Sequence, residues 1–479
     1  MTQWGGVTET LTGDSIPAMT ELYGLPVFLG VASAAQGAVK TFDKYSNIRG
    51  NIGYGPLTRE VEDFFACGGQ KSKCIARVLV PDTPGANGAT TVTGTSLATG
   101  TAGGTPNDAY KVLVEVLTGG AVAVAVIRAS LDGGATWLPK VTVPADGVVE
   151  LGTSGATLTL DTTAGDLVQG DTYAWDTTAP VASTSVITAA IDEVLAAYRG
   201  AFEFFVVVGD TASAFLTTLD TKLTAEWNNH NPIFAVCEAG PLAAGTLAAD
   251  VAALIADIAS FESRYLLVTA GKAWDTGRAG VYQERGINGS VAGILSKGKV
   301  SDSIGVLRDD FGKIVPAAEL RPTGITDADL VLLNEARYTV PRKYEGYPGL
   351  FPNNGNLMSA PGDPFDSVEK LRVAGKMMRL MRVAALRNLQ LDADNTAAGS
   401  FGGESGLEYL RAELMRSVRP MFLAGELYKC VPNILSTPDD VFLDNTVRVR
   451  IDFSTNPKMK LIELEFDLIS PTEFERRNA

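Results

Sequence analysis

The sequence predicts a multidomain protein of mixed α/β and α+β class. We expect a split α/β layer domain, an all-β sandwich inserted into it, a C-terminal domain of two helices and a β-hairpin, and extended terminal arms. Apolar runs typical of buried parallel strands alternate with helical patterns, a Thr- and Gly-rich stretch interrupts them, and two alternating strands close the chain. At 479 residues, the chain has room for about three domains.

The composition is that of an acidic, globular protein. Hydrophobic residues make up 46 % and charged residues 20 %, which excludes wholesale disorder. The 55 Asp and Glu residues outnumber the 40 Lys and Arg residues and give a net charge of −15. Because affinity for a phosphate backbone needs clustered positive charge, we expect no nucleic acid partner.

The chain shows no pattern of export or membrane insertion. The first basic residue is Lys40, so the N-terminus lacks the positive region of a secretory signal. The most apolar windows, 121–127 and 251–268, are too short or are interrupted by charges. We therefore expect synthesis to end in the cytoplasm. The spacing of the four cysteines favours reduced thiols at Cys67, Cys74, Cys237 and Cys430.

The chain is expected to begin with an arm and continue as a split α/β domain. Residues 1–24 carry too little apolar surface to pack as a unit. Strands and helices then alternate in two blocks, 25–85 and 186–340. The expected strands are 25–32, 74–80, 202–208, 232–237 and 264–269, and the expected helices are 57–66, 186–198, 212–227 and 248–261.

The interruption at 86–185 has a different composition. It holds 19 Thr, 14 Gly, nine acidic residues and three basic ones, which gives it a net charge of −6. Short alternating runs between Gly- and Asp-rich turns are typical of a small immunoglobulin-like sandwich. We expect an inserted outer domain of this kind.

One motif in this insertion is sharply defined. The segment 130–137 resembles the Asp-box of sialidases through Ser130, Asp132, Gly134, Thr136 and Trp137. Such residues shape and brace a hairpin and supply no catalytic group. Because the motif occurs once and no arginine cluster accompanies it, we interpret it as a structural hairpin; glycan binding by the insertion is the minor alternative.

Residues 341–458 are expected to form a C-terminal core domain. A Pro-, Gly- and Asn-rich stretch, 341–364, precedes two helices, 367–389 and 406–419. Positive charge gathers on these helices, at Arg372, Lys376, Arg379 and Arg387 on one stripe and at Arg411, Arg416 and Arg419 on the next helix. Such a stripe is either a solvated face or a surface for an acidic protein partner.

Two alternating strands end the chain. Residues 447–453 alternate apolar and mostly basic side chains, and residues 462–468 alternate apolar and acidic ones. If these strands pair, the basic face of one meets the acidic face of the other. The last of them lies in a C-terminal strand or arm, 459–479.

No convergent set of catalytic, metal-binding or cofactor-binding residues is visible. The single histidine, His230, lies in a polar connecting segment, so zinc sites and Ser/His or Cys/His relays cannot be assembled. The segment 293–300 approaches a phosphate loop, but Val300 replaces the hydroxyl that would bind magnesium. The glycines of 50–55 have the wrong spacing for a dinucleotide fingerprint and indicate a turn. We expect no enzyme and no cofactor.

The order of these parts resembles the tail sheath proteins of contractile bacteriophages and related contractile injection systems. The resemblance covers most of the chain outside 86–185. It includes Pro26-Val-Phe-Leu-Gly-Val31, then Gly53-Tyr-Gly-Pro-Leu-Thr-Arg-Glu-Val61 leading to Phe64-Phe65, the split α/β domain and the C-terminal unit. The sequence departs from better-known members between Glu335 and Pro364, where only Gly346-Tyr-Pro-Gly-Leu-Phe351 represents their usual motif.

The resemblance implies a structural subunit that polymerises. Sheath proteins form stacked hexameric rings around a tail tube and contract to drive the tube through the host envelope. Their terminal arms add strands to sheets of neighbouring subunits, and Gly5, Gly6 and Pro457 become hinge candidates. The arm residues implied here are Val7, Thr8, Glu9, Leu11, Ile462, Leu464, Phe466 and Leu468.

The resemblance also implies partners and a location. Sheaths attach to the tube through a helix of the C-terminal domain, which by order is the helix of 406–419 with Arg411, Arg416 and Arg419. Arg372, Lys376 and Arg379 form the rival set. Further partners are other copies of the chain, the baseplate and the tail terminator. The implied location of the chain is the virion tail, which is assembled in the host cytoplasm. The inserted domain is expected to face outward.

Two other classes stay open at this point. A surface-layer or adhesion protein decorated by a β domain would also be acidic and Thr-rich, but it should carry an export signal. An α/β nucleotide-binding enzyme would need a concave site with perturbed ionisable groups, and nucleotide binding at Lys299 would favour it.

Overall fold

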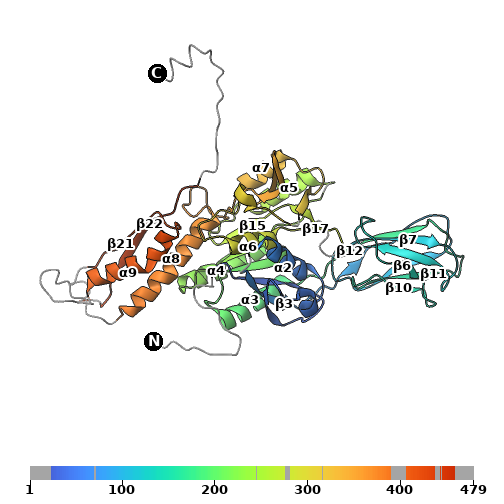
Figure 1. Cartoon of the computed structure of the whole chain (residues 1–479), viewed down its shortest axis with the longest axis horizontal. Helices are drawn as coiled ribbons and strands as arrows, with labels where there is room; N and C mark the ends of the chain where they lie inside the picture. The colour runs from blue at the N-terminus through green and yellow to red at the C-terminus, as the bar shows by residue number, and fades with distance from the viewer. Residues whose placement is uncertain are drawn as a thin grey trace, which may run out of the picture. The chain divides into compact units, whose positions relative to one another are not determined.

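The computed structural model describes residues 23–69, 72–243, 245–275, 281–315, 317–389, 406–436, 443 and 445–458. The chain divides into two compact units, Met1–Leu389 and Gln390–Ala479. Figure 1 shows the order of the elements along the chain. The expected C-terminal domain begins at residue 341, whereas this division places the helix α8 (Val368–Arg387) in the first unit.

The first unit is built on a six-stranded sheet in the order β15-β14-β13-β1-β3-β2. Five strands run parallel and β2 is antiparallel at the edge. Their bounds are β1 Pro26–Val31, β2 Val39–Asp43, β3 Lys73–Leu79, β13 Phe204–Asp210, β14 Phe234–Glu238 and β15 Leu266–Thr269. The five parallel strands lie within about two residues of their expected positions, because continuous apolar runs are what a sheet buried on both faces requires.

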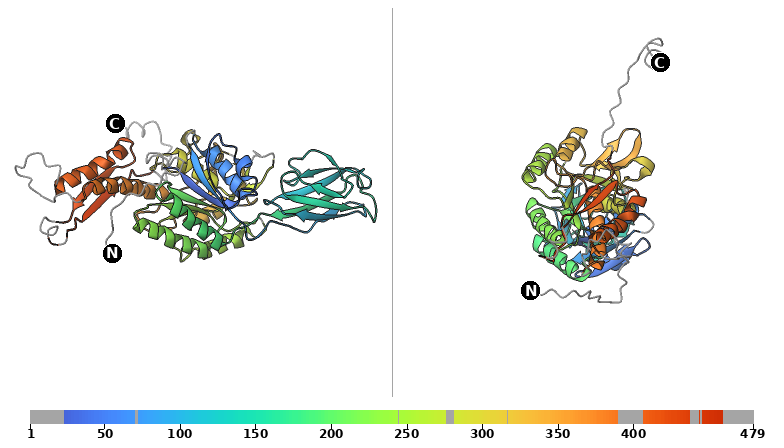
Figure 2. Two further views of the ribbon diagram at one scale, coloured as in Figure 1. Left: turned by 90° about the horizontal axis from the view of Figure 1, so that it is seen from below. Right: turned by 90° about the vertical axis from the view of Figure 1, so that its left-hand side faces the viewer.

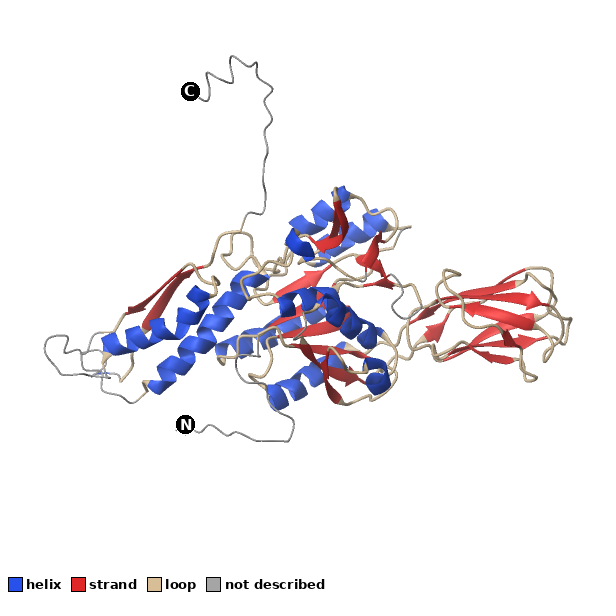
Figure 3. Cartoon of the chain, viewed as in Figure 1, coloured by secondary structure: helices blue, strands red, loops and turns tan. Residues whose placement is uncertain are grey.

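Helices cover both faces of this sheet (Figure 3). Successive strand residues point to opposite faces, so Val27 and Leu29 join one core and Phe28 joins the other. The first core is covered by α3 Thr184–Tyr198, α4 Ser213–Asn228, α5 Leu247–Asp257 and α7 Asp327–Glu335. The second core is covered by α2 Pro56–Cys67, α6 Asn288–Lys297 and the start of α8. The unit is therefore a three-layer α/β/α domain.

The turn before α2 explains the glycine-rich motif at 50–55. The short helix α1, Ile48–Ile52, ends at Gly53, and Gly55 takes a φ of +134° directly before Pro56, which opens α2. A Cβ at Gly55 would lie 3.0 Å from the carbonyl oxygen of Asn107. The expectation of a turn holds for residues 53–55, whereas Gly50 lies inside α1.

Most of the segment that approaches a phosphate loop, residues 293–297, belongs to the helix α6, which Gly298 caps. Gly293 lies inside α6, and a Cβ there would lie 2.4 Å from the carbonyl oxygen of Phe64 in α2. This glycine allows the two helices to pack backbone against backbone. A helix interior presents no row of free amides to a phosphate, so nucleotide binding at Lys299 loses its sequence argument.

Smaller elements complete the first unit. A three-stranded sheet has the order β17-β16-β18, and a two-stranded ladder joins β19 to β20. Their bounds are β16 Lys272–Asp275, β17 Glu284–Arg285, β18 Ala317–Arg321, β19 Pro341–Tyr344 and β20 Tyr347–Pro352, with a single 3-10 turn at Arg308–Asp310. These short elements lack a clear period, which is why the sequence did not predict them.

The insertion is a sandwich of two antiparallel sheets (Figure 2). One sheet has the order β10-β11-β6, and the other has the order β4-β12-β7-β8-β9, with β5 also paired to β12. The bounds are β4 Ala86–Asn87, β5 Thr91–Thr93, β6 Thr99–Gly104, β7 Lys111–Thr118, β8 Val126–Ser130, β9 Val141–Thr142, β10 Val148–Glu150, β11 Ala156–Asp161 and β12 Thr172–Thr178. Both sheets contribute to one buried core around Tyr173 and Leu158.

The described part of the second unit holds a helix and two strands. The helix α9, Leu407–Leu423, buries Leu407, Leu414, Val418 and Met421 along one face. The strands β21, Lys429–Ile434, and β22, Val449–Ser454, pair antiparallel, with Lys429 opposite Ser454. The sequence did not predict β21 as a partner of β22, because Pro432 weakens its strand signal. Residues 462–468 lie outside the described residues.

Candidate functional site

Two residues of the basic stripe of α8, Arg372 and Arg379, are turned into the protein, whereas Arg387 is exposed. Arg372 forms a two-pronged ion pair with Glu203, from Nε to Oε1 at 2.8 Å and from Nη2 to Oε2 at 3.0 Å. The two side chains are 1 % and 5 % exposed. The assignment of Arg372 to an external partner is therefore corrected. The face of α8 that carries Arg372 can pack against the sheet, because Glu203, the residue before β13, neutralises the guanidinium there.

Arg379 lies in the same interior. It is 9 % exposed, and its Nη2 donates to the carbonyl oxygens of Pro232 at 2.8 Å and Phe202 at 3.3 Å. Burial lowers the pKa of this guanidinium. The assignment of Arg379 to an external partner is therefore corrected as well. Of this rival set Lys376 keeps partial exposure, with its Nζ 5.1 Å from the centre of the Tyr23 ring.

The basic side chains of α9 are exposed. Arg416 lies opposite the buried face of the helix and is 79 % exposed, while Arg411 is 44 % exposed. Each has an acidic neighbour one turn earlier, Glu413 at 3.0 Å and Glu408 at 3.7 Å. Arg419 is exposed as well. The α9 set is therefore the part of the predicted basic surface that an external partner can reach.

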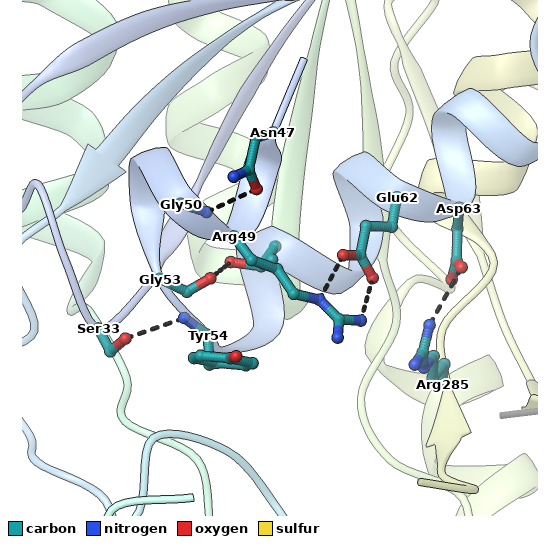
Figure 4. A network of polar contacts seen from close by, with 10 residues as sticks. Ser33, Asn47, Arg49, Gly50, Gly53, Tyr54, Glu62, Asp63 and Arg285 are labelled. Atoms are coloured by element: carbon teal, nitrogen blue, oxygen red, sulfur yellow. Dashed lines mark hydrogen bonds and ion pairs between the residues drawn. The ribbon is translucent and has the colours of Figure 1, made fainter. Parts of the chain in front are cut away.

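Two ion pairs connect α2 with the short helix α1 before it and with β17 (Figure 4). Arg49 of α1 binds both oxygens of Glu62 at 2.6 and 2.9 Å. Arg285 of β17 binds Asp63 at 3.1 Å, and both side chains are 3 % exposed. Together these ion pairs hold α1, α2 and β17 in one arrangement. These four charged side chains therefore pair with one another within the subunit.

A convergent polar cluster lies at the carboxyl end of the parallel strands, where sequence analysis expected none. Glu60 of α2 accepts a hydrogen bond from the backbone N–H of Gly289, and Asn288 accepts one from the Thr269 hydroxyl at 2.6 Å. Glu238, the last residue of β14, lies nearby. The signal available in the sequence was the position of Glu238 at the end of an apolar run, at the edge where α/β proteins bind ligands.

Burial dominates the chemistry of this cluster. It raises the pKa of Glu60 to about 8 and that of Glu238 to about 7. Glu60 is 5 % exposed, Glu238 is 8 % exposed and Asn288 is fully buried. Side chains enclosed in this way pin α6 against α2 and the sheet. They present no group to a substrate in solution.

The predicted hairpin of the insertion is braced by Asp132. Its Oδ1 accepts from the Thr136 amide at 2.8 Å and from the Ser130 hydroxyl at 2.7 Å, and its Oδ2 accepts from the Thr136 hydroxyl at 2.6 Å. The Gly134 amide donates to the Ser130 hydroxyl at 2.8 Å. The Trp137 ring packs under the guanidinium of Arg128 at 4.0 Å. All five motif residues thus serve the turn between β8 and β9.

The base of the insertion is tied to the α/β domain by polar contacts. Arg59 of α2 pairs with Asp108 at 2.6 Å, and the Gln283 amide donates to the carbonyl oxygen of Ala109 at 2.8 Å. The backbone N–H of Tyr282 donates to Asp132 at 3.1 Å. The hairpin therefore contributes to the junction as well as to the sandwich.

Several predicted residues lie outside the described residues. These are the arm residues Val7, Thr8, Glu9, Leu11, Ile462, Leu464, Phe466 and Leu468. Within the described part of the chain, no three His, Cys, Asp or Glu side chains gather as a metal site would require. No helix there is both long and apolar enough to cross a bilayer. The four cysteines are buried free thiols.

Known structures share this fold. The sheath complex of the extracellular contractile injection system PVC, in its contracted state, matches with a TM-score of 0.53 and 11 % identity over 98 % of this chain and 99 % of that one. The contracted helical sheath of the anti-feeding prophage AFP gives the same values. A structure of the anti-feeding prophage AFP baseplate matches with a TM-score of 0.53 and 11 % identity over 98 % of this chain and 100 % of that one.

Sequence comparisons give the family. No curated protein sequence matches the chain. Two family models do match, described as the DUF2586 N-terminal domain over residues 4–356 and the DUF2586 C-terminal domain over residues 365–473. These two matches take in most of the chain, including both blocks of the α/β domain and the strands β21 and β22. The chain is a member of the DUF2586 family, and its fold is that of contractile sheath proteins.

Proposed function

We propose that the chain is the sheath subunit of a contractile tail. It polymerises into stacked hexameric rings around a tail tube and contracts to drive the tube through the host envelope. The observation that carries this proposal is the likeness to two contracted sheaths over 98 % of the chain. In line with this role, the buried charges of Arg372 and Glu203 in the α/β domain pair with each other.

The two-stranded sheet of the second unit supports assembly by strand addition. Within the described residues, β21 and β22 have only each other as neighbours. An extended segment of another copy can add a strand to a small sheet of this kind. We propose that residues 1–24 and 459–479 are those segments. Contacts of this head-to-tail kind generate an open helical filament.

The proposed partners follow from this arrangement. The tail tube contacts the exposed α9 set, Arg411, Arg416 and Arg419, whereas the acidic sandwich faces outward and keeps the filament soluble. The baseplate and the tail terminator bind the two ends of the stack. The particle is a virion tail or a related injection device, and it assembles in the host cytoplasm.

The proposal is tested by negative-stain electron microscopy of the purified full chain beside a chain of residues 25–458. We expect tubes or rings from the full chain and none from the shortened one. A shortened chain that polymerises equally well would refute strand addition by the arms. A full chain that stays monomeric at high concentration and raised salt would refute the sheath proposal itself.

A further inference from the structure

A small cavity lies in the first unit beside the charged interior of α8. Its wall includes Arg372, Lys376 and Arg379 of α8, Glu203 at the start of β13, and the aromatic side chains of Tyr23 and Trp227. Its volume is about 10 Å³, which accommodates a single water-sized particle. The enclosed part of the cavity therefore has room for one atom-sized ligand.

Two buried guanidinium groups bring unused donors to this cavity. Arg372 donates Nε and Nη2 to Glu203, and Arg379 donates Nη2 to two carbonyl oxygens. In each side chain Nη1 is buried and finds no acceptor in the described part of the chain. Arg372 is 3 % exposed and Arg379 is 9 % exposed. Because buried donors are almost always hydrogen-bonded, we expect each of these two Nη1 groups to have an acceptor.

The charge around the cavity selects the kind of acceptor. Among the described residues that line it, the buried guanidinium groups of Arg372 and Arg379 face one carboxylate, Glu203. Both oxygens of Glu203 are already engaged, Oε1 by Arg372 and Oε2 by Arg372 and the backbone N–H of Gly24. The other described residues of the wall carry no carboxylate, and the Tyr23 ring lies 6.0 Å from the Arg379 guanidinium carbon. The local excess of positive charge favours an anion over a neutral water molecule.

We propose that this cavity binds one monoatomic anion, chloride in the cell, held by Nη1 of Arg372 and Nη1 of Arg379. Tyr23 and Gly24 begin the described chain, while Arg372 and Arg379 belong to α8. A bound chloride joins these segments to the start of β14 through Pro232 and Phe234, which also line the cavity. The site is structural and does not depend on the proposed sheath function.

Thermal unfolding of the full chain in sodium chloride and in sodium gluconate, at equal ionic strength and pH, tests the site. Above the dissociation constant, each tenfold rise in chloride should raise the ratio of folded to unfolded protein tenfold, because the anion binds the folded state alone. Arg379→Gln should lose this chloride dependence. The matched control Arg199→Gln, at an exposed ion pair with Glu226, should keep it.

Two readouts need no variant and decide the matter if Arg379→Gln fails to fold. Line broadening of the chloride-35 resonance by the wild-type chain should be reversed by bromide. Crystals grown in bromide should show an anomalous peak between Arg372 and Arg379. Equal unfolding curves in both salts, or the absence of a bromide peak at this place, would overturn the proposal and leave water as the occupant.

Discussion

Glu60 is a buried carboxyl group whose charge state affects the free energy of unfolding. Its ordinary pKa is 4.5, and burial raises the pKa in the folded chain to about 8. Below pH 4.5 both states hold the proton. As the pH rises from there to about 8, the unfolded chain releases a proton that the folded chain keeps, so stability falls. Glu238 acts in the same direction, with a pKa of about 7.

We expect Glu60→Gln to weaken this pH dependence, because the amide oxygen still accepts from Gly289 and carries no charge to release. The wild-type chain should lose more stability than the variant between pH 5 and pH 8.5, by about 1.4 kcal/mol for each unit of pKa shift. Urea unfolding at several pH values measures the difference. Glu335→Gln, exposed at the end of α7, should follow the wild type. Parallel curves for Glu60→Gln and the wild type would contradict this account.

Arg372 offers a test of the buried ion pair with Glu203. Arg372→Met leaves an unpaired carboxylate in the interior and should cost about 3–5 kcal/mol in the free energy of unfolding. Arg199→Met removes a pair whose arginine is 49 % exposed and should cost less than about 1 kcal/mol. Adding Glu203→Gln to Arg372→Met should recover part of the loss. Equal effects of the two single variants in urea unfolding would show that burial of the pair is unimportant.

At the scale of elements, α9 is the predicted tube-binding helix. The double reversal Arg416→Glu and Arg419→Glu should weaken co-sedimentation with the tail tube protein by about tenfold or more, while the circular dichroism spectrum stays unchanged. Both side chains are exposed, so the reversal does not disturb the buried face of the helix. Arg382→Glu with Arg387→Glu, exposed on α8, is the matched control. Equal loss in both double variants would indicate a general charge effect.

Some elements could be predicted from the sequence, whereas the orientation of others could not. The parallel strands were predictable, since residues such as Val27 and Phe28 on neighbouring positions are both apolar and both faces of the sheet are covered. The direction in which α8 turns its basic stripe was not predictable, because the decisive partner of Arg372 is Glu203, 169 residues away. A charged residue before the apolar run 204–208 was the available signal.

The same reasoning applies to the candidate site. The exposed position of Arg416, opposite the buried face of α9, follows from the helical spacing of the apolar residues, since a single helix defines that face. It gave no sign of the cluster around Glu60 and Asn288, which forms where α2, α6, β14 and β15 meet. Local pattern predicts a face of one element, whereas convergent sites depend on tertiary packing between segments far apart in the sequence.

At the scale of the whole molecule, the central claim is that terminal arms join copies of the chain into a sheath. A helical reconstruction by cryo-electron microscopy of the full-length polymer tests this claim most directly. The account predicts rings of six subunits in which residues 1–24 or 459–479 of one copy extend the β21–β22 sheet of another. Arms that fold back onto their own subunit, or a polymer without six-fold rings, would contradict it.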